Sequence, residues 1–244
     1  MKHNQAKKML LLLSLLGITF SFISCSASDE EQTAEEAQIS EEEAAESLAL
    51  AISPKSNGVV QLSIQASLNI EASLDVTYEC NQEYTNSYQL DYNGAALSYI
   101  AAYNWAWQLN CSDNILLDCA LALKGTTEYE SQRMNSDGDM TATVGISNLE
   151  QSEPNYSLTM DYTLISEQVS RVRMQKSFDS TIKVNGDVSL MKENQKLTGG
   201  QVEASFTGLS STGNTYEYSG VVVFNGDNTA TLTMQSGNTY AISW

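Results

Sequence analysis

From Val60 onward, apolar and polar residues alternate along most of the chain. In the first run, residues 60–80, every second residue is apolar or aromatic and the residues between them are polar. A period of two is typical of a β-strand with one buried face and one exposed face. One strand of this length would extend for roughly 70 Å at about 3.3 Å per residue. The run therefore predicts two strands joined by a turn or bend near residues 69–73.

The alternation continues to the end of the chain and is interrupted by short segments of turn-forming residues. These segments are Asn93-Gly94, Lys124-Gly125, Asp137-Gly138, Pro154-Asn155, Asn185-Gly186, Gly199-Gly200, Asn225–Asn228 and Ser236–Asn238. About a dozen strands with short connections predict an all-β domain, built as a large antiparallel meander. A barrel, a half-barrel and a sandwich all fit this pattern.

The N-terminal segment has a different pattern. Lys2, Lys7 and Lys8 precede an apolar run over residues 9–22, and the small residue Ser24 precedes Cys25. This order of a basic segment, a short apolar run and a small residue is typical of an export signal. The run is shorter than the ~20 residues that cross a bilayer as a helix. Residues 1–24 are therefore predicted to be a signal peptide.

The residues around Cys25 resemble a known processing motif. Phe22-Ile23-Ser24-Cys25 resembles the lipobox of bacterial lipoproteins, which are cut before a cysteine that carries lipid. The acidic segment Ser26–Glu31 resembles the surface-export signal of Bacteroidota lipoproteins. The resemblance implies acyl chains such as palmitate on Cys25, which together anchor a protein firmly in a membrane. It also implies an outer-membrane lipoprotein exposed at the cell surface, with a periplasm-facing domain as the alternative.

Residues 25–57 are predicted to be the lipidated cysteine and an acidic tether. Acidic residues and alanine dominate this segment, which contains no aromatic residue. Thr33–Glu36 fits a capping box, and the following residues favour a helix as far as Ile52, where Ser53-Pro54 would end it. We expect a solvated, partly helical spacer. It would hold a single all-β domain, residues 58–244, away from the membrane.

The charge limits the range of partners. The formal net charge is −18. Residues 1–24 hold three lysines and no acidic residue, so the remainder holds nine basic and 30 acidic residues, a formal charge of −21. Such a chain repels the phosphates of nucleic acid, which we exclude as a partner, and it repels anionic lipid surfaces. Glycans, lipids and proteins, including basic proteins, are compatible with this charge.

The single histidine, His3, lies in the signal peptide. Without an imidazole, the exported chain cannot form Ser-His-Asp or Cys-His catalytic groups or His-ligated metal sites. The sequence also has no glycine-rich phosphate-binding motif, so we predict no cofactor and no enzymatic activity. A pair of carboxylates, as in a glycan hydrolase, is the alternative chemistry.

Three cysteines follow Cys25, namely Cys80, Cys111 and Cys119. An oxidising compartment favours one disulfide and leaves one thiol. Cys111 and Cys119 are closest in sequence and would close a short loop across a hairpin. Pairing of Cys80 with either of them is the alternative, because connectivity does not follow from sequence.

An aromatic cluster is the first candidate binding site. Tyr99, Tyr103, Trp105 and Trp107 lie on one face of a predicted strand. They could form a platform for sugar rings or line an apolar ligand cavity. The core face of a central strand is the favoured interpretation, because Leu97 and Leu109 share that face.

Asp137 and Asp139 are weak candidates for calcium ligands. Their segment, 135–139, has the oxygen donors that calcium prefers, but its spacing departs from the EF-hand pattern. A hairpin turn accounts for the same residues. We therefore predict no metal site.

The chain end suggests one further alternative. Gln235, Gly237, Tyr240 and Trp244 resemble the C-terminal assembly signal of outer-membrane barrels, whose strands also alternate over about ten residues. The leading hypothesis is a lipid-anchored cell-envelope lipoprotein whose extracytoplasmic β-domain binds or scaffolds an unknown ligand. A carboxylate-based glycan hydrolase and an integral outer-membrane β-barrel are the alternatives.

Overall fold

The computed structural model describes residues 38–74, 79–113, 115–172 and 176–244. The lipobox, Cys25 and the expected capping box at Thr33–Glu36 lie outside these residues. Two α-helices come first, α1 (Glu41–Ile52) and α2 (Val59–Leu74), joined through the 3-10 turn η1 (Pro54–Ser56). Neither helix is long and apolar enough to span a membrane.

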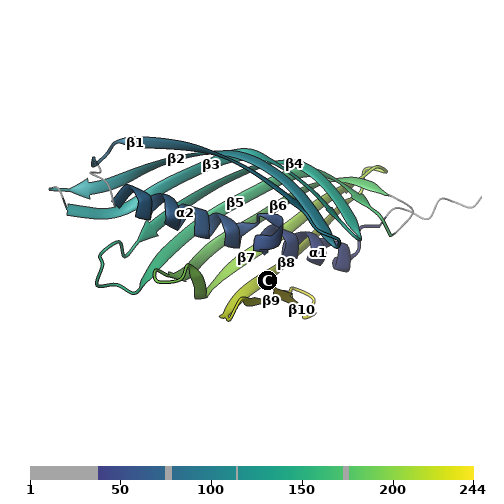
Figure 1. The fold of residues 1–244 in the computed structure, drawn as a ribbon. Helices are drawn as coiled ribbons and strands as arrows, with labels where there is room; N and C mark the ends of the chain where they lie inside the picture. Colours follow the sequence, from purple (N-terminus) through teal and green to yellow (C-terminus); the bar gives the residue numbers. More distant parts are fainter. Residues whose placement is uncertain (1–37, 75–78, 114, 173–175) are drawn as a thin grey trace, which may run out of the picture. The chain divides into compact units, whose positions relative to one another are not determined.

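Ten strands follow the helices and form one antiparallel sheet, in which each strand pairs with the next in sequence. They are β1 (Glu83–Asn93), β2 (Leu97–Ser112), β3 (Ile115–Ser131), β4 (Met134–Ser147), β5 (Asn155–Ser170), β6 (Ser177–Met191), β7 (Lys196–Ser210), β8 (Thr215–Gly226), β9 (Thr229–Met234) and β10 (Thr239–Ser243). The described sheet is open, with β1 and β10 as its edges, and it curves around the helices (Figure 1). The predicted all-β meander is confirmed, and its form is closest to a half-barrel.

Four of the predicted turns lie inside strands instead. Lys124-Gly125, Asp137-Gly138, Asn185-Gly186 and Gly199-Gly200 fall within β3, β4, β6 and β7. Gly186 has φ +145°, and a Cβ there would clash with the carbonyl oxygen of Gln201 on β7. Glycine permits such a close approach of two backbones and marks a bend in a strand. The strands are therefore longer, and fewer, than the turn signals suggested.

The run that begins at Val60 is helical as far as Leu74, so its prediction as β-strands was wrong. The buried residues of α2 recur at spacings of three and four, and they include Leu62, Ser63, Ala66, Ser67, Ile70 and Ser73. The buried serine hydroxyls donate to carbonyl oxygens of their own helix, as in Ser63 to Val59 at 2.8 Å and Ser73 to Asn69 at 2.8 Å. A small hydroxyl that is satisfied in this way can be buried. The sequence of α2 therefore alternates like a strand, although its buried residues lie on one side of a helix.

Helix α1 also packs against the sheet. It begins after Ser40, whose side chain forms a capping box with Glu43, and it ends at Ile52 as expected. Ala44, Leu48 and Ile52 on α1 are fully buried. Both helices cover the same face of the sheet (Figure 1). Residues 41–57 are therefore part of the core of the domain rather than a solvated spacer.

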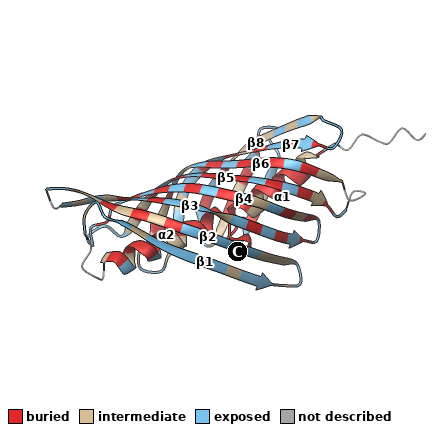
Figure 2. Cartoon of the chain, turned by 90° about the horizontal axis from the view of Figure 1, so that it is seen from above, coloured by how far each residue is buried: buried red, intermediate tan, exposed pale blue. Residues whose placement is uncertain are grey.

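The strands bury one face and expose the other (Figure 2). The buried face packs against α1 and α2, and its largest enclosed side chains include Tyr103, Trp105 and Phe206. The other face, which we call the exposed face, carries mostly polar and charged residues. This is the wet face that the alternation predicted, and α1 and α2 cover the apolar side.

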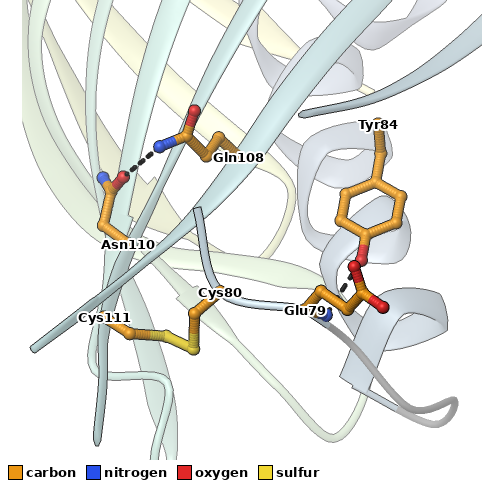
Figure 3. Close-up of a disulfide and its surroundings, with 6 residues drawn as sticks. All are labelled: Glu79, Cys80, Tyr84, Gln108, Asn110 and Cys111. Atoms are coloured by element: carbon orange, nitrogen blue, oxygen red, sulfur yellow. Dashed lines mark hydrogen bonds between the residues drawn. A yellow bond between two sulfur atoms is a disulfide. The ribbon is translucent and has the colours of Figure 1, made fainter. Parts of the chain in front are cut away.

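A disulfide joins Cys80 to Cys111, with a Cα–Cα distance of 5.5 Å (Figure 3). The expected Cys111–Cys119 bond does not form, because Cys119 lies opposite Leu109 in the β2–β3 register. Diagonal positions of this kind are roughly 7–8 Å apart, beyond the usual reach of a disulfide. Cys119 is the remaining thiol in the described chain. Burial raises its pKa to about 12, so it is a poor nucleophile at neutral pH.

Loss of the disulfide is expected to destabilise the domain strongly. The bond closes a loop with a sequence separation of 31 residues, and the chain-entropy model gives about 3–4 kcal/mol for a loop of this size. Paired replacement of Cys80 and Cys111 by serine should lower the urea midpoint accordingly. The Cys119→Ala variant is the control, because it leaves the bond intact. Equal midpoints for the paired variant and the native chain would show that the bond contributes nothing.

Candidate functional site

The aromatic cluster is largely part of the core. Tyr103, Trp105 and Trp107 are buried beneath the helices. The Tyr103 hydroxyl donates to Asn57 Oδ1 at 3.4 Å, and Trp107 Nε1 donates to Ser73 Oγ at 3.0 Å. Tyr99 is only half-buried. These contacts make the first three side chains core residues rather than an open platform for a ligand.

Asp137 and Asp139 both lie on the exposed face of β4, inside the strand and away from any hairpin. Among the described residues, no group of three or more His, Cys, Asp or Glu side chains is placed to hold a metal ion. Asp137 nevertheless has two acidic neighbours. It lies directly opposite Glu128 on β3 and Glu167 on β5.

These neighbours belong to a longer line of carboxylates across the sheet. Glu128, Asp137, Glu167 and Asp179 lie directly opposite one another on β3, β4, β5 and β6. All four are exposed. We call these four residues the acidic row. Neighbouring strands are about 4.7–4.9 Å apart, so the row places like charges side by side.

Like charges directly opposite one another destabilise a sheet. The two ion pairs among the described residues join Arg133 to Glu46 and Arg171 to Glu130, so neither neutralises the acidic row. The arrangement is therefore expected to cost stability in the free protein. Costs of this kind are typical of functional sites, where stability is given up for binding.

The repulsion can be measured in the row itself. The Asp137→Asn variant is expected to stabilise the domain by about 0.4–2 kcal/mol, because it removes two like-charge contacts of about 0.2–1 kcal/mol each. Asp161→Asn is the matched control, since Asp161 lies on the same face between the uncharged Thr143 and Asn185. Urea unfolding of both variants tests the expectation. An equal effect of the two substitutions would mean that the row is not specifically strained.

A shallow groove of about 710 Å³ crosses strands β1 to β5 beside the acidic row. One side of the groove is lined by Asp91, Ile100, Glu128, Asp137 and Glu167, and the other side by Asn93, Ser98, Glu130, Asn135 and Val169. Each set follows the strand register across the exposed face. The residues between the two sets have their side chains on the helix-covered face, so their backbone forms the floor.

The groove is lined by carboxylates, among them Glu128, Asp137 and Glu167. Carboxylate and amide oxygens accept hydrogen bonds, so the matching ligand group is a cationic donor, an ammonium or a guanidinium. Ile100 adds an apolar surface, being 47% exposed. This chemistry fits a basic segment that also carries apolar side chains.

Comparison with known proteins does not add to this picture: no family model, no curated protein and no solved structure matches the chain. Sequence reasoning singled out Asp137 but not the acidic row. The missing information was the strand register, which brings together residues up to 51 positions apart, from Glu128 to Asp179.

Proposed function

We propose that this chain is a lipid-anchored lipoprotein of the cell envelope and that the exposed face of its β-domain binds a basic partner. The observation that carries the binding role is the acidic row beside an open groove. The lipid anchor on Cys25 and the cell-surface location rest on the resemblance of residues 22–31 to lipoprotein signals.

The division of the sheet into two faces supports a role for the exposed face. The helices occupy the apolar face, so an external partner meets the polar one. Single exposed ion pairs contribute little to stability, roughly 0–1 kcal/mol each. A row of carboxylates acts together, attracts cationic partners from a distance and loses this attraction as salt rises. Binding through the groove is therefore expected to weaken with ionic strength.

The binding role is tested with a chain that begins at residue 26 and a peptide that carries lysine, arginine and apolar residues. A peptide with glutamine in place of each basic residue is the ligand control. The triple variant Glu128→Gln, Asp137→Asn and Glu167→Gln should lose most of the affinity in titration calorimetry.

The matched protein control is the triple variant Asp161→Asn, Asp187→Asn and Glu217→Gln. These residues are exposed carboxylates outside the groove, so the variant has the same net charge as the groove variant. Equal losses in the two variants would point to non-specific attraction by the acidic protein. Absence of binding to the basic peptide in the native chain would contradict the proposal.

The anchor is tested separately in the exporting cell. Metabolic labelling with an alkyne-modified fatty acid should mark the full-length chain and should not mark the Cys25→Ala variant. Protease treatment of intact cells then distinguishes a surface-exposed domain from a periplasm-facing one. Label that persists in the variant would remove Cys25 as the lipid site.

A carboxylate-based glycan hydrolase is the second candidate function. The strand register of the acidic row favours it. Directly opposite residues place carboxylates at roughly the 5–10 Å separation that glycosidases use. Every member of the row is exposed, however, whereas a general acid is usually buried to raise its pKa. Glu43 is the one buried carboxylate among the described residues, and it is held by Ser40 and Ser170 beneath α1. Release of reducing ends from glycans, lost in the groove variant, would establish this activity.

The membrane-integral alternative has a different requirement. It needs the apolar stripes of the strands to face lipid. In the described sheet these stripes, which include Leu121, Val144 and Leu158, pack in the core that the helices close. The lipid anchor is therefore the form of membrane attachment that we propose.

A further inference from the structure

The outer side of β1 is an unpaired edge. Among the described strands, β1 pairs only with β2, and its residues are mostly exposed (Figure 2). The opposite edge, β10, is five residues long, and Lys55 Nζ donates to the carbonyl oxygen of Ser243 there at 3.3 Å. β1 is 11 residues long. A long edge presents a row of backbone donors and acceptors that can pair with another strand.

The sequence of β1 lacks the features that usually prevent such pairing. Its only charged residues, Glu83 and Asp91, lie at or near its ends, and it contains no proline or glycine. Proteins usually protect an exposed edge with central charges, proline, bulges or a very short strand. The segment between the two acids contains Tyr84, Thr85 and Tyr88, which are residue types that favour strands. This edge is therefore suited to pairing rather than guarded against it.

Three tyrosines lie at equal spacing along this edge. Tyr84, Tyr88 and Tyr92 share the helix-covered face of β1, four residues apart. Each stacks inward on an aromatic ring of β2: Tyr84 on Trp107 at 5.8 Å, Tyr88 on Tyr103 at 5.7 Å, and Tyr92 on Tyr99 at 5.5 Å between ring centroids. The spacing is symmetric about Tyr88. The edge thus has the self-complementary pattern that a two-fold interface requires.

We propose that β1 is a dimer interface, in which it pairs antiparallel with β1 of a second copy about a two-fold axis at Tyr88. In this register Tyr88 lies opposite Tyr88 of the second copy. Tyr84 of each copy lies opposite Tyr92 of the other. The three tyrosine rings that stack on β2 therefore also meet tyrosine rings of the second copy. Aromatic pairs directly opposite on neighbouring strands stabilise a sheet by about 0.2–1 kcal/mol each.

The charges select the same register. With the axis at Tyr88, Asp91 lies opposite Thr85 and Glu83 lies opposite Asn93, so no acid faces an acid. An axis at Ser87 would place Glu83 opposite Asp91 at both ends of the interface, which is unfavourable. An axis at Gln89 would place no tyrosine opposite another. A shift of the pairing by one residue would place the tyrosines of the two copies on opposite faces of the joined sheet.

Salt should strengthen this dimer. Each exported chain has a formal charge of −21, so two copies repel one another at a distance. The screening length falls from about 10 Å at 0.1 M salt to about 3 Å at 1 M. The interface itself contains no ion pair that salt would weaken. This response is opposite to that expected for the basic partner in the groove, so the two proposals can fail independently.

Cysteine cross-linking of the full-length lipoprotein tests the register. Tyr88→Cys should give a disulfide-linked dimer on a non-reducing gel, because directly opposite residues have Cα atoms about 4.5–5.5 Å apart. Gln89→Cys alone should not give a disulfide-linked dimer, because Gln89 lies opposite Ser87 of the second copy. Co-expressed Ser87→Cys and Gln89→Cys chains should form a cross-linked heterodimer. Cross-links at Gln89→Cys but not at Tyr88→Cys would overturn the proposed register.

Sedimentation of the chain that begins at residue 26 tests the affinity without a new thiol. Thr85→Glu places a negative charge opposite Asp91 of the second copy at two symmetric positions, and should weaken the dimer roughly 2- to 30-fold. Thr85→Lys should strengthen it. Thr85 is exposed, so neither change disturbs the core.

Thr215→Glu and Thr215→Lys are the controls, because Thr215 is exposed on β8 and the net charge changes equally. Two results would overturn the proposal. One is a chain that stays monomeric at every concentration and salt level and gives no cross-link at Tyr88→Cys. The other is a dimer that responds equally to changes at Thr85 and Thr215.

Discussion

A chain that begins at residue 56 is expected not to form a stable, monomeric β-domain, whereas one that begins at residue 38 is expected to fold. The shorter chain lacks Ile39 and the whole of α1, and so it loses the buried side chains of Ile39, Leu48 and Ile52 together with several alanines. Burial of a large aliphatic side chain contributes about 1.5–3 kcal/mol, so these three contribute roughly 5–9 kcal/mol. That is comparable with the whole stability of a domain, about 5–15 kcal/mol.

Hydrogen bonds between α1 and the sheet add to the expected loss. Ser170 Oγ donates to Glu43 Oε1 at 2.9 Å, and Ser47 Oγ donates to Gln168 Oε1 at 2.8 Å. Gln168 and Ser170 are 0% and 1% exposed. Without α1, Gln168 Oε1 and Ser170 Oγ lose these partners, and a hydrogen bond of this kind contributes about 0.5–1.5 kcal/mol to stability.

Circular dichroism and binding of a hydrophobic dye measure this difference. The chain from residue 38 should melt cooperatively, because it contains every buried core residue that the structure describes. The chain from residue 56 should bind the dye and aggregate. A cooperative melt of that shorter chain at an unchanged temperature would show that α1 is dispensable, as a tether would be.

The sheet was largely predictable because its signals are local. Asn93-Gly94, Pro154-Asn155 and the two C-terminal turns separate strands as expected. Glycine inside a long strand was misread. Gly125 on β3 leaves room for the backbone of β2, where any Cβ would clash with Ala102. Glycine is favoured both in a tight turn and at a bend in a curved sheet, so sequence alone does not distinguish the two.

The helices were misjudged for a different reason. Serines of α2 were counted as polar, although Ser63 and Ser67 are completely buried. Their hydroxyls bond to the helix backbone, and their small size lets the helix approach the sheet. In α1, the buried Glu43 looked like a solvated acid, but its capping bonds and Ser170 satisfy it. A local sequence pattern does not reveal hydrogen-bond partners that are distant in sequence.

The acidic row was not predictable because it depends on register across four strands. Glu128 and Asp137 are close in sequence, but Glu167 and Asp179 join them only through the β4–β5 and β5–β6 pairings. Shifting one strand by two residues would disperse the row without changing any local pattern. The same holds for the disulfide, whose partner was decided by the position of Cys119 opposite Leu109.

The Trp105→Ala variant is expected to lose about 3–5 kcal/mol of stability, the usual cost of removing a large buried aromatic side chain. Trp105 is 1% exposed and packs edge-on against Tyr103, with ring centroids 6.0 Å apart. For a domain of this size, each kcal/mol lowers the melting temperature by about 2–4 °C, so a fall of about 6–20 °C is expected. Thermal and urea unfolding both measure it.

Trp105→Phe separates the two interpretations of the aromatic cluster. The indole Nε1 of Trp105 is buried without a partner in the described chain. Phenylalanine keeps most of the apolar contact and removes this unsatisfied donor, so its cost should be well below that of alanine. In an open ligand platform, both substitutions would weaken ligand binding and leave the melting temperature almost unchanged. A large fall for alanine and a small one for phenylalanine would place Trp105 in the core, and leave the exposed face as the surface on which ligands should be sought.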